Sequence, residues 1–266
     1  MAGVSQQHSS RLGRYYCMKV LEINPRGERT VIMLAGYMFN AWSLAPLAHS
    51  LSSYRVFCID SICADTYKPN ALQAFCQTLA QFISSRAIVD PILVGYSFGG
   101  FAAQLFCKTF PSICDKLILL GSCAPWDHTR FNFSHGLRFM RYLFTLERSD
   151  FFYAAMFSIL SPASQSDTTI ISSIQKDFLS DFPNARLCTL QLLAMRRLAQ
   201  AAPHFNQQVS TYLIYAIDDR VIPPAQSRLA SNSFAKLEFT SVPGTHFFVY
   251  ENHELVADHI TKWIEQ

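Results

Sequence analysis

Alternation of apolar strands with amphipathic helices is the feature that most restricts the fold of this chain. Short apolar runs typical of strands occur at 15–25, 29–37, 54–60, 91–97 and 116–122, and helical spacing occurs at 42–53, 70–86 and 101–110. Because most of these runs are apolar at successive positions, both faces of each strand are expected to be buried. The pattern predicts an α/β fold with a mostly parallel central sheet and helices on both faces.

The alternation stops in the middle of the chain and then returns. Residues 123–202 are aromatic-rich and helical in pattern, whereas 211–219 and 236–244 again look like strands, and 254–266 form a closing amphipathic helix. We therefore predict one core, made of residues 1–122 and 203–266, with 123–202 inserted between two strands of the same sheet as a helical cap.

Composition excludes several classes of protein. Half of the 266 residues are apolar, 15% are charged and the net charge is +3, which disfavours a disordered chain or a nucleic-acid partner. Residues 1–14 lack the apolar core of a signal peptide, and no run suits a membrane span, so we expect a cytoplasmic protein. The eight cysteines show neither C-x-x-C nor metal spacing and are expected to be reduced core residues.

A serine flanked by glycines follows the strand pattern at 91–97. Gly95-Tyr96-Ser97-Phe98-Gly99 matches G-x-S-x-G and lies between a strand and a helix. In a sharp turn of this kind the serine hydroxyl projects from the carboxyl edge of the sheet, where open α/β folds bind ligands. This context favours Ser97 as a nucleophile over a chance match.

A serine hydroxyl needs a base, and the base needs an anion to orient it. His246 follows a Pro-Gly turn in a loop before the last helix, and Asp218 and Asp219 end the strand at 211–219. Either aspartate could point inward from that position. The other histidines have no comparable context.

The order Ser, Asp, His on strand ends resembles the α/β-hydrolase superfamily across nearly the full chain. The motifs that carry the resemblance are the G-x-S-x-G turn, the Asp-Arg-Val-Ile-Pro loop, the late histidine loop and the inserted helical region. The resemblance implies an α/β-hydrolase fold with Ser97 as nucleophile and His246 as base. It also implies that Asp219, rather than Asp218, is the acid.

Acyl transfer also needs two N–H donors for the oxyanion. The resemblance implies that one comes from Phe98 and the other from the loop after the strand at 29–37, where we choose Tyr37 and place Met38 second. This loop reads Ala35-Gly36 where relatives usually have His-Gly, and residues 61–67 lack the glycine-rich turn of many members. The loop has no Gly-Gly-Gly run, which disfavours the lipase type whose oxyanion hole is built on such a run.

The aromatic residues of the predicted cap have two interpretations. They either pack a small helical layer or form the underside of a lid over Ser97. For the second case we expect Met38, Trp126, Phe139 and Tyr142 to bind substrate. The arginines of this region either face solvent or contact an anionic group or an acidic carrier protein; they are Arg138, Arg141, Arg148, Arg196 and Arg197.

The predicted function is a serine hydrolase that cleaves a small-molecule carboxylic ester with an apolar acyl or alcohol part through an acyl-enzyme. It needs no metal or organic cofactor. The alternative is a thioesterase acting on acyl-carrier-protein or coenzyme A thioesters. A second alternative is a ligand-binding protein that retains the fold with little turnover.

Overall fold

A sheet of eight strands forms the centre of the molecule, and its order is β1-β2-β4-β3-β5-β6-β7-β8. The structure is a computed structural model that describes residues 10–15, 18–61, 71–124, 133–201, 209–229 and 234–266. The strands are β1 (Ser10–Tyr15), β2 (Met18–Ile23), β3 (Arg29–Leu34), β4 (Tyr54–Ile59), β5 (Ile92–Tyr96), β6 (Lys116–Leu120), β7 (Ser210–Ala216) and β8 (Leu237–Val242). Neighbouring strands from β4 to β8 run parallel, whereas β2 is antiparallel to both β1 and β4. The predicted mostly parallel sheet is confirmed.

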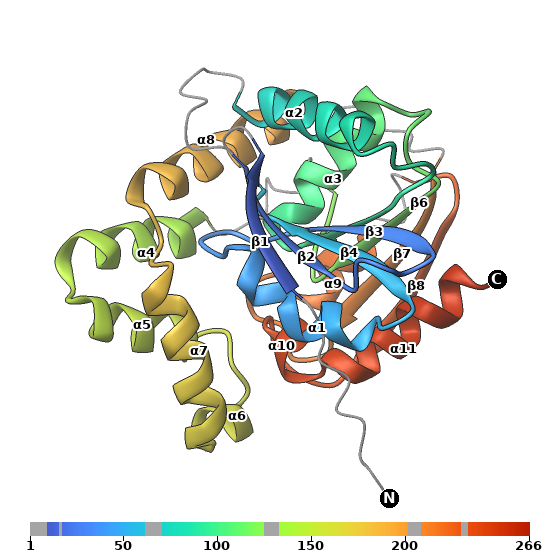
Figure 1. Cartoon of the computed structure of the whole chain (residues 1–266). Coiled ribbons are helices and arrows are strands. Elements are labelled where there is room, and N and C mark those ends of the chain that lie inside the picture. The colour runs from blue at the N-terminus through green and yellow to red at the C-terminus, as the bar shows by residue number, and fades with distance from the viewer. Residues whose placement is uncertain (1–9, 16–17, 62–70, 125–132, 202–208, 230–233) are drawn as a thin grey trace, which may run out of the picture.

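Helices cover both faces of this sheet (Figure 1). Helices α2 (Ala71–Ser85) and α3 (Phe98–Thr109) lie on one face, and α1 (Ala45–Ser50) and α11 (His253–Ile264) lie on the other. Successive side chains of a strand point to opposite faces. In β3, Val31 and Met33 accordingly join the core beside α1 and α11, whereas Ile32 and Leu34 join the core beside α2 and α3.

Among the described residues between β6 and β7 there are five helices, and we call α4–α8 the helical segment. They are α4 (Phe133–Thr145), α5 (Arg148–Met156), α6 (Pro162–Ser166), α7 (Thr168–Ser180) and α8 (Ala185–Ala201). They form a lobe beside the sheet, on the left of Figure 1. Helix α8 returns to the core, where Leu192 and Met195 pack in the same apolar cluster as α2 and α3.

Three elements differ from the sequence prediction. The expected strand at 15–25 contains β2 (Met18–Ile23) and the last residue, Tyr15, of an additional edge strand, β1, which pairs with β2 along its full length. The sequence of β1, Ser-Arg-Leu-Gly-Arg-Tyr, has no apolar run because an edge strand is held by backbone pairing to one neighbour. The short helix α10 (Phe248–Glu251) occupies part of the predicted histidine loop, and a further short helix, α9 (Pro224–Leu229), follows the Asp-Arg-Val-Ile-Pro loop, where no element is predicted from the sequence.

Cysteine placement agrees with the expectation from spacing. The cysteines that the structure describes are buried and free: Cys58, Cys76, Cys107, Cys114, Cys123 and Cys188. Cys17 and Cys63 lie outside the described residues. Within the described ranges, no helix has the length and apolar character needed to cross a membrane.

Candidate active site

The turn between β5 and α3 holds Ser97 in a strained conformation. Ser97 has φ 50° and ψ −117°, a region that costs a non-glycine residue about 1–3 kcal/mol. Its amide donates to the carbonyl of Leu120 at 2.8 Å, and its carbonyl accepts from Ser122 Oγ at 2.9 Å. These bonds to the β6 end of the sheet keep the strained turn in place.

Close backbone approach explains the glycines on either side of Ser97. A Cβ atom on Gly95 would lie 2.5 Å from Gly100 Cα, and one on Gly99 would lie 2.1 Å from the Leu34 carbonyl oxygen. Neither neighbour is a flexible side chain, so no larger residue fits without moving the backbone. The G-x-S-x-G pattern is therefore a requirement of packing between β5, α3 and β3.

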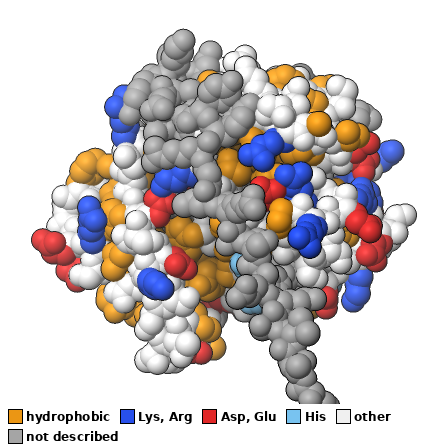
Figure 2. Space-filling view, in the orientation of Figure 1, with side chains coloured by type: hydrophobic (Ala, Val, Ile, Leu, Met, Phe, Trp, Pro, Cys, Tyr) orange, Lys and Arg blue, Asp and Glu red, His pale blue; other side chains and the backbone are white. Residues whose placement is uncertain are grey.

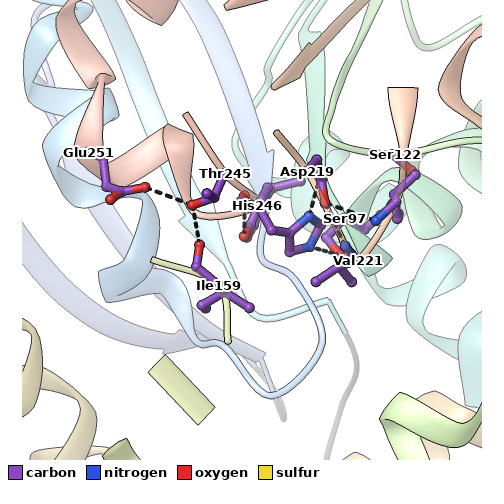
Figure 3. Close-up of polar contacts among 10 residues, drawn as sticks. Ser97, Ser122, Ile159, Asp219, Val221, Thr245, His246 and Glu251 are labelled. Carbon is purple, nitrogen blue, oxygen red and sulfur yellow. Dashed lines mark hydrogen bonds and ion pairs between the residues drawn. The ribbon is translucent and has the colours of Figure 1, made fainter. Parts of the chain in front are cut away.

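Asp219, His246 and Ser97 lie in one row of hydrogen bonds (Figure 3). His246 Nδ1 is 2.7 Å from Asp219 Oδ2, and His246 Nε2 is 2.9 Å from Ser97 Oγ. All three residues are buried. Asp219 Oδ1 accepts from the amides of Val221 at 2.8 Å and Ile222 at 2.9 Å, which orients Oδ2 towards the ring. Asp218 is exposed, so the structure places Asp219 beside the histidine.

The loop that carries His246 is fixed from two sides. Tyr96 Oη donates to the His246 carbonyl at 3.0 Å. Burial, reinforced by the nearby carboxylates of Asp219 and Glu251, raises the pKa of Tyr96 well above its usual value, so the phenol stays protonated as a donor.

The helical segment supplies the second anchor of this loop. The Ile159 carbonyl, just after α5, accepts from Thr245 Oγ1 and from the Phe247 amide, the residues on either side of His246 (Figure 3). Glu251 adds a further link, because its Oε1 accepts from the amide of Ser161 at 2.9 Å and from the Ser161 hydroxyl at 2.7 Å. The histidine loop is thus tied directly to the helical segment.

The two residues expected to supply oxyanion donors lie beside Ser97. Phe98 begins α3, and the first amides of a helix have no partner within it. Tyr37 and Met38 both line the cavity that contains Ser97. The Met38 amide donates to Gln191 Oε1 at 3.2 Å, whereas the Tyr37 amide has no acceptor in the described part of the chain. Tyr37 is therefore the better placed donor of the two.

An apolar cavity of about 630 Å³, including its open mouth, adjoins Ser97 and His246. Its walls come from residues 35–41, which we call the oxyanion loop after its expected role, from α3, from the residues after Asp219 and from the helical segment. The segment contributes Ala155, Met156, Ile159, Leu192 and Met195. Apart from Ser97 and His246, the described lining residues are all hydrophobic or aromatic, so the cavity suits a hydrocarbon group.

Prediction of the cavity lining was only partly accurate. Met38 lines the cavity, but Tyr142 is not among its described lining residues and packs half-buried against the core. Trp126 and the side chain of Phe139 lie outside what the structure describes. Sequence reasoning missed Met156, Ile159, Leu192 and Met195. Leu192 and Met195 are spaced by three residues on α8, and this spacing is the signal for their shared helix face, whereas Ile159 follows the end of α5 and carries no such signal.

The aromatic residues of the helical segment mostly serve other purposes. Phe151 and Phe152 are buried with Phe178, and their ring centroids lie 6.0 and 5.5 Å from it. Phe144 and Phe157 are exposed, and Figure 2 shows hydrophobic side chains scattered among charged ones over the segment, on the left. Aliphatic and methionine side chains, rather than aromatic ones, form the segment's side of the cavity.

A buried carboxyl group, that of Asp60, holds the end of the oxyanion loop. Asp60 Oδ1, just after β4, accepts from the Ala41 amide at 2.8 Å. Burial raises the pKa of Asp60 to about 7. It lines a second cavity of about 290 Å³ together with Ser61, Cys188 and Gln191. Asp60 shapes the loop, and it lies outside the row of Asp219, His246 and Ser97.

Comparison with known proteins places this geometry in context. Solved structures with the same fold include a putative lipase from Acinetobacter baumannii AYE, 12% identical over 97% of this chain and 91% of that chain, with a TM-score of 0.78. A thermophilic esterase from Thermogutta terrifontis is 16% identical over 97% and 98%, with a TM-score of 0.78. A putative non-heme bromoperoxidase from Mycobacterium tuberculosis H37Rv is 18% identical over 98% of both chains, with a TM-score of 0.76.

These similarities concern the fold, because identity is low. No curated protein matches the sequence. The sequence model of the alpha/beta hydrolase family matches residues 31–259, which includes the sheet from β3 onward, the helical segment and the residues around Ser97, Asp219 and His246. This chain belongs to the alpha/beta hydrolase family.

Proposed function

We propose that this protein is a serine hydrolase that cleaves carboxylic esters with an apolar acyl or alcohol part. The observation that carries the proposal is the hydrogen-bonded row from Asp219 through His246 to Ser97, which ends at an apolar cavity. Such a row activates a hydroxyl that is otherwise a weak nucleophile. The esterase and the putative lipase among the proteins of similar fold are consistent with it.

The proposed reaction starts with attack of Ser97 Oγ on the ester carbonyl. His246 Nε2 takes the hydroxyl proton, and Asp219 stabilises the imidazolium from Nδ1. The negative oxygen of the tetrahedral intermediate accepts from the amides of Phe98 and Tyr37. His246 then gives its proton to the leaving alkoxide. Water, activated by the same ring, hydrolyses the acyl-enzyme and regenerates Ser97.

The cavity supports an apolar group next to the scissile bond. Each Å² of hydrocarbon surface buried there makes the binding free energy more favourable by about 25 cal/mol, whereas a charged group would lose its hydration without finding a partner. We further propose that residues 123–202 act as a cap, because Met156, Ile159, Leu192 and Met195 close one side of the cavity.

Covalent labelling tests the proposal directly. The purified protein is treated with a fluorophosphonate and analysed by intact mass, alongside Ser97→Ala, His246→Ala and Ser227→Ala. Ser227 is a fully buried serine in α9, outside the residues lining the cavity, and serves as the matched control. We expect one adduct in wild type and Ser227→Ala, none in Ser97→Ala, and strongly slowed labelling in His246→Ala. A folded wild-type protein without an adduct would contradict the proposal.

Substrate profiling then separates esters from thioesters. A series of 4-nitrophenyl esters and coenzyme A thioesters of matched chain length is assayed with wild type and Ser97→Ala. We expect Ser97-dependent hydrolysis of apolar esters. A kcat/KM consistently higher for the thioesters would replace the ester assignment by a thioesterase one.

A further inference from the structure

Gln191 in α8 reaches from the helical segment to the oxyanion loop, residues 35–41. Its side chain is buried, with 4% of the residue exposed. Its Oε1 accepts from the amide of Met38 at 3.2 Å, across 153 positions of sequence. A buried amide without an acceptor is costly, so this bond selects the position of the Met38 peptide.

The oxyanion loop lies directly against the nucleophile. A Cβ atom on Gly36 would be 3.3 Å from Ser97 Cβ, so a small change in the loop alters the surroundings of Ser97. Other bonds hold the loop on either side of Met38: the Ala35 amide donates to the Ile59 carbonyl at 3.0 Å, the Phe39 amide donates to the Gly36 carbonyl at 3.2 Å, and the Ala41 amide donates to Asp60. In the described chain, Gln191 is the group that holds the Met38 amide.

Met38 is in a conformation that needs this support. Its φ of 64° lies in the left-handed region, which disfavours a residue with a long side chain. If the Met38 amide has no acceptor, rotation of the peptide between Tyr37 and Met38 lowers the free energy, because it relieves the positive φ of Met38. That rotation changes ψ of Tyr37 and φ of Met38, and the turn closed by the Phe39–Gly36 bond must readjust around it, which moves the Tyr37 amide from its position beside Ser97.

We propose that Gln191 is a positioning residue for the oxyanion hole, acting through the Met38 amide on the amide of Tyr37. This rests on the proposed hydrolase function. Gln191 precedes Leu192, which lines the cavity, so the same turn of α8 encloses the substrate and orders the donor. The oxyanion hole is complete only while the helical segment is seated on the core.

Gln191→Met tests this inference, because methionine keeps the length of the side chain and removes the strong acceptor. On the best apolar ester, we expect kcat to fall by about 10- to 100-fold, as for a displaced rather than deleted donor, with KM within about threefold. Thr189→Val is the control on the same helix; the Thr189 hydroxyl donates to Ala185 within α8, and its loss should leave kcat unchanged.

Inhibitor binding separates positioning from a general structural role. A trifluoromethyl ketone of matched chain length forms a tetrahedral oxyanion with Ser97, whereas the corresponding alcohol does not. For Gln191→Met, we expect the affinity for the ketone to fall by the same factor as kcat/KM, and the affinity for the alcohol to stay as in wild type. Equal weakening of both inhibitors, or a change confined to KM, would overturn the inference.

A second pair of variants keeps the test decisive if Gln191→Met does not fold. Gln191→Leu removes the acceptor with a smaller side chain. Met38→Gly removes the steric cost of positive φ, so the loss on replacing Gln191 should be smaller in that background. If replacing Gln191 lowered kcat equally in the wild-type and Met38→Gly proteins, Gln191 would not act through Met38. A wild-type protein that hydrolyses no ester would instead refute the proposed function.

Discussion

Asp219→Asn should abolish most of the turnover while leaving the fold intact. The carboxylate of Asp219 accepts from the amides of Val221 and Ile222 through Oδ1 and from His246 Nδ1 through Oδ2. In the variant, the asparagine oxygen keeps the two backbone bonds, and its NH2 group faces the ring. His246 must then accept at Nδ1 and carry its proton on Nε2, 2.9 Å from Ser97 Oγ. A ring in that tautomer cannot take the serine proton.

The opposite orientation of the asparagine does not rescue the enzyme. Turning its oxygen to the ring would leave the Val221 and Ile222 amides facing an NH2 group, and each unpaired buried donor costs about 1–3 kcal/mol. The wrong tautomer therefore dominates. The loss expected for such a change is about 10⁴-fold in kcat, or roughly 5 kcal/mol.

Steady-state hydrolysis of the best ester, with labelling rates as a second readout, measures this loss. KM should change little, because the Asp219 side chain is fully buried behind the ring and does not line the cavity. Asp218→Asn is the matched control and should stay within about twofold, since Asp218 is exposed. If folded Asp219→Asn kept a tenth of wild-type kcat, or if Asp218→Asn lost more than Asp219→Asn, the assignment of the acid would be wrong.

Three further changes test the cavity, the oxyanion loop and the serine turn. Leu192→Trp should shift the preferred acyl chain to shorter lengths, with about 10- to 200-fold loss on the longest good substrate, and a chain-length profile of kcat/KM measures it. Asp60→Asn should be more stable than wild type at high pH. Because burial raises the pKa of Asp60 to about 7, the wild-type protein has its full folding stability from this group below about pH 4, where the carboxyl is neutral, and loses up to roughly 4 kcal/mol of it as the pH rises to about 7. Urea unfolding of both proteins at pH 5 and 8 should therefore show a gap that widens at pH 8, and a constant gap would contradict the raised pKa. Gly99→Ala should not give a stable protein, because its Cβ would lie 2.1 Å from the Leu34 carbonyl oxygen; a melting temperature within 3 °C of wild type, roughly the shift for 1 kcal/mol, would show that the turn can relax.

Residues around Ser97 could be predicted from sequence because close backbone contacts restrict which residues fit there. Gly95 is required by a backbone contact within the turn and Gly99 by the approach of Leu34 on the neighbouring strand β3, and the turn fixes the conformation of Ser97. Parallel strands bring their carboxyl ends to one edge, so Asp219 and His246 were expected near Ser97 from strand order alone. The choice between Asp218 and Asp219 depends on a resemblance when the sequence is taken alone, because the backbone bonds that orient Asp219 towards His246 leave no mark in the sequence.

Residues of the helical segment could not be predicted in the same way. Which face of α8 meets the cavity depends on how that helix packs against α2, α3 and the oxyanion loop, and no local pattern records that packing. Aromatic content suggested the lining, yet Phe151 and Phe152 pack inside the segment. A polar residue such as Gln191 looks like an exposed helix position in sequence, because its partner, the Met38 amide, is a backbone group.

In the proposed mechanism, the contacts of the helical segment join substrate enclosure to catalysis. Ile159 lines the cavity with its side chain, and its carbonyl accepts from the residues on both sides of His246. Gln191 holds the oxyanion loop, and its neighbour Leu192 lines the cavity. A substrate that displaces either wall therefore displaces the base or the oxyanion donor with it. Since a shift of about 1 Å in a catalytic group can cost about 100-fold in rate, poorly fitting acyl groups should lose kcat as well as affinity, and selectivity should be expressed in the chemical step.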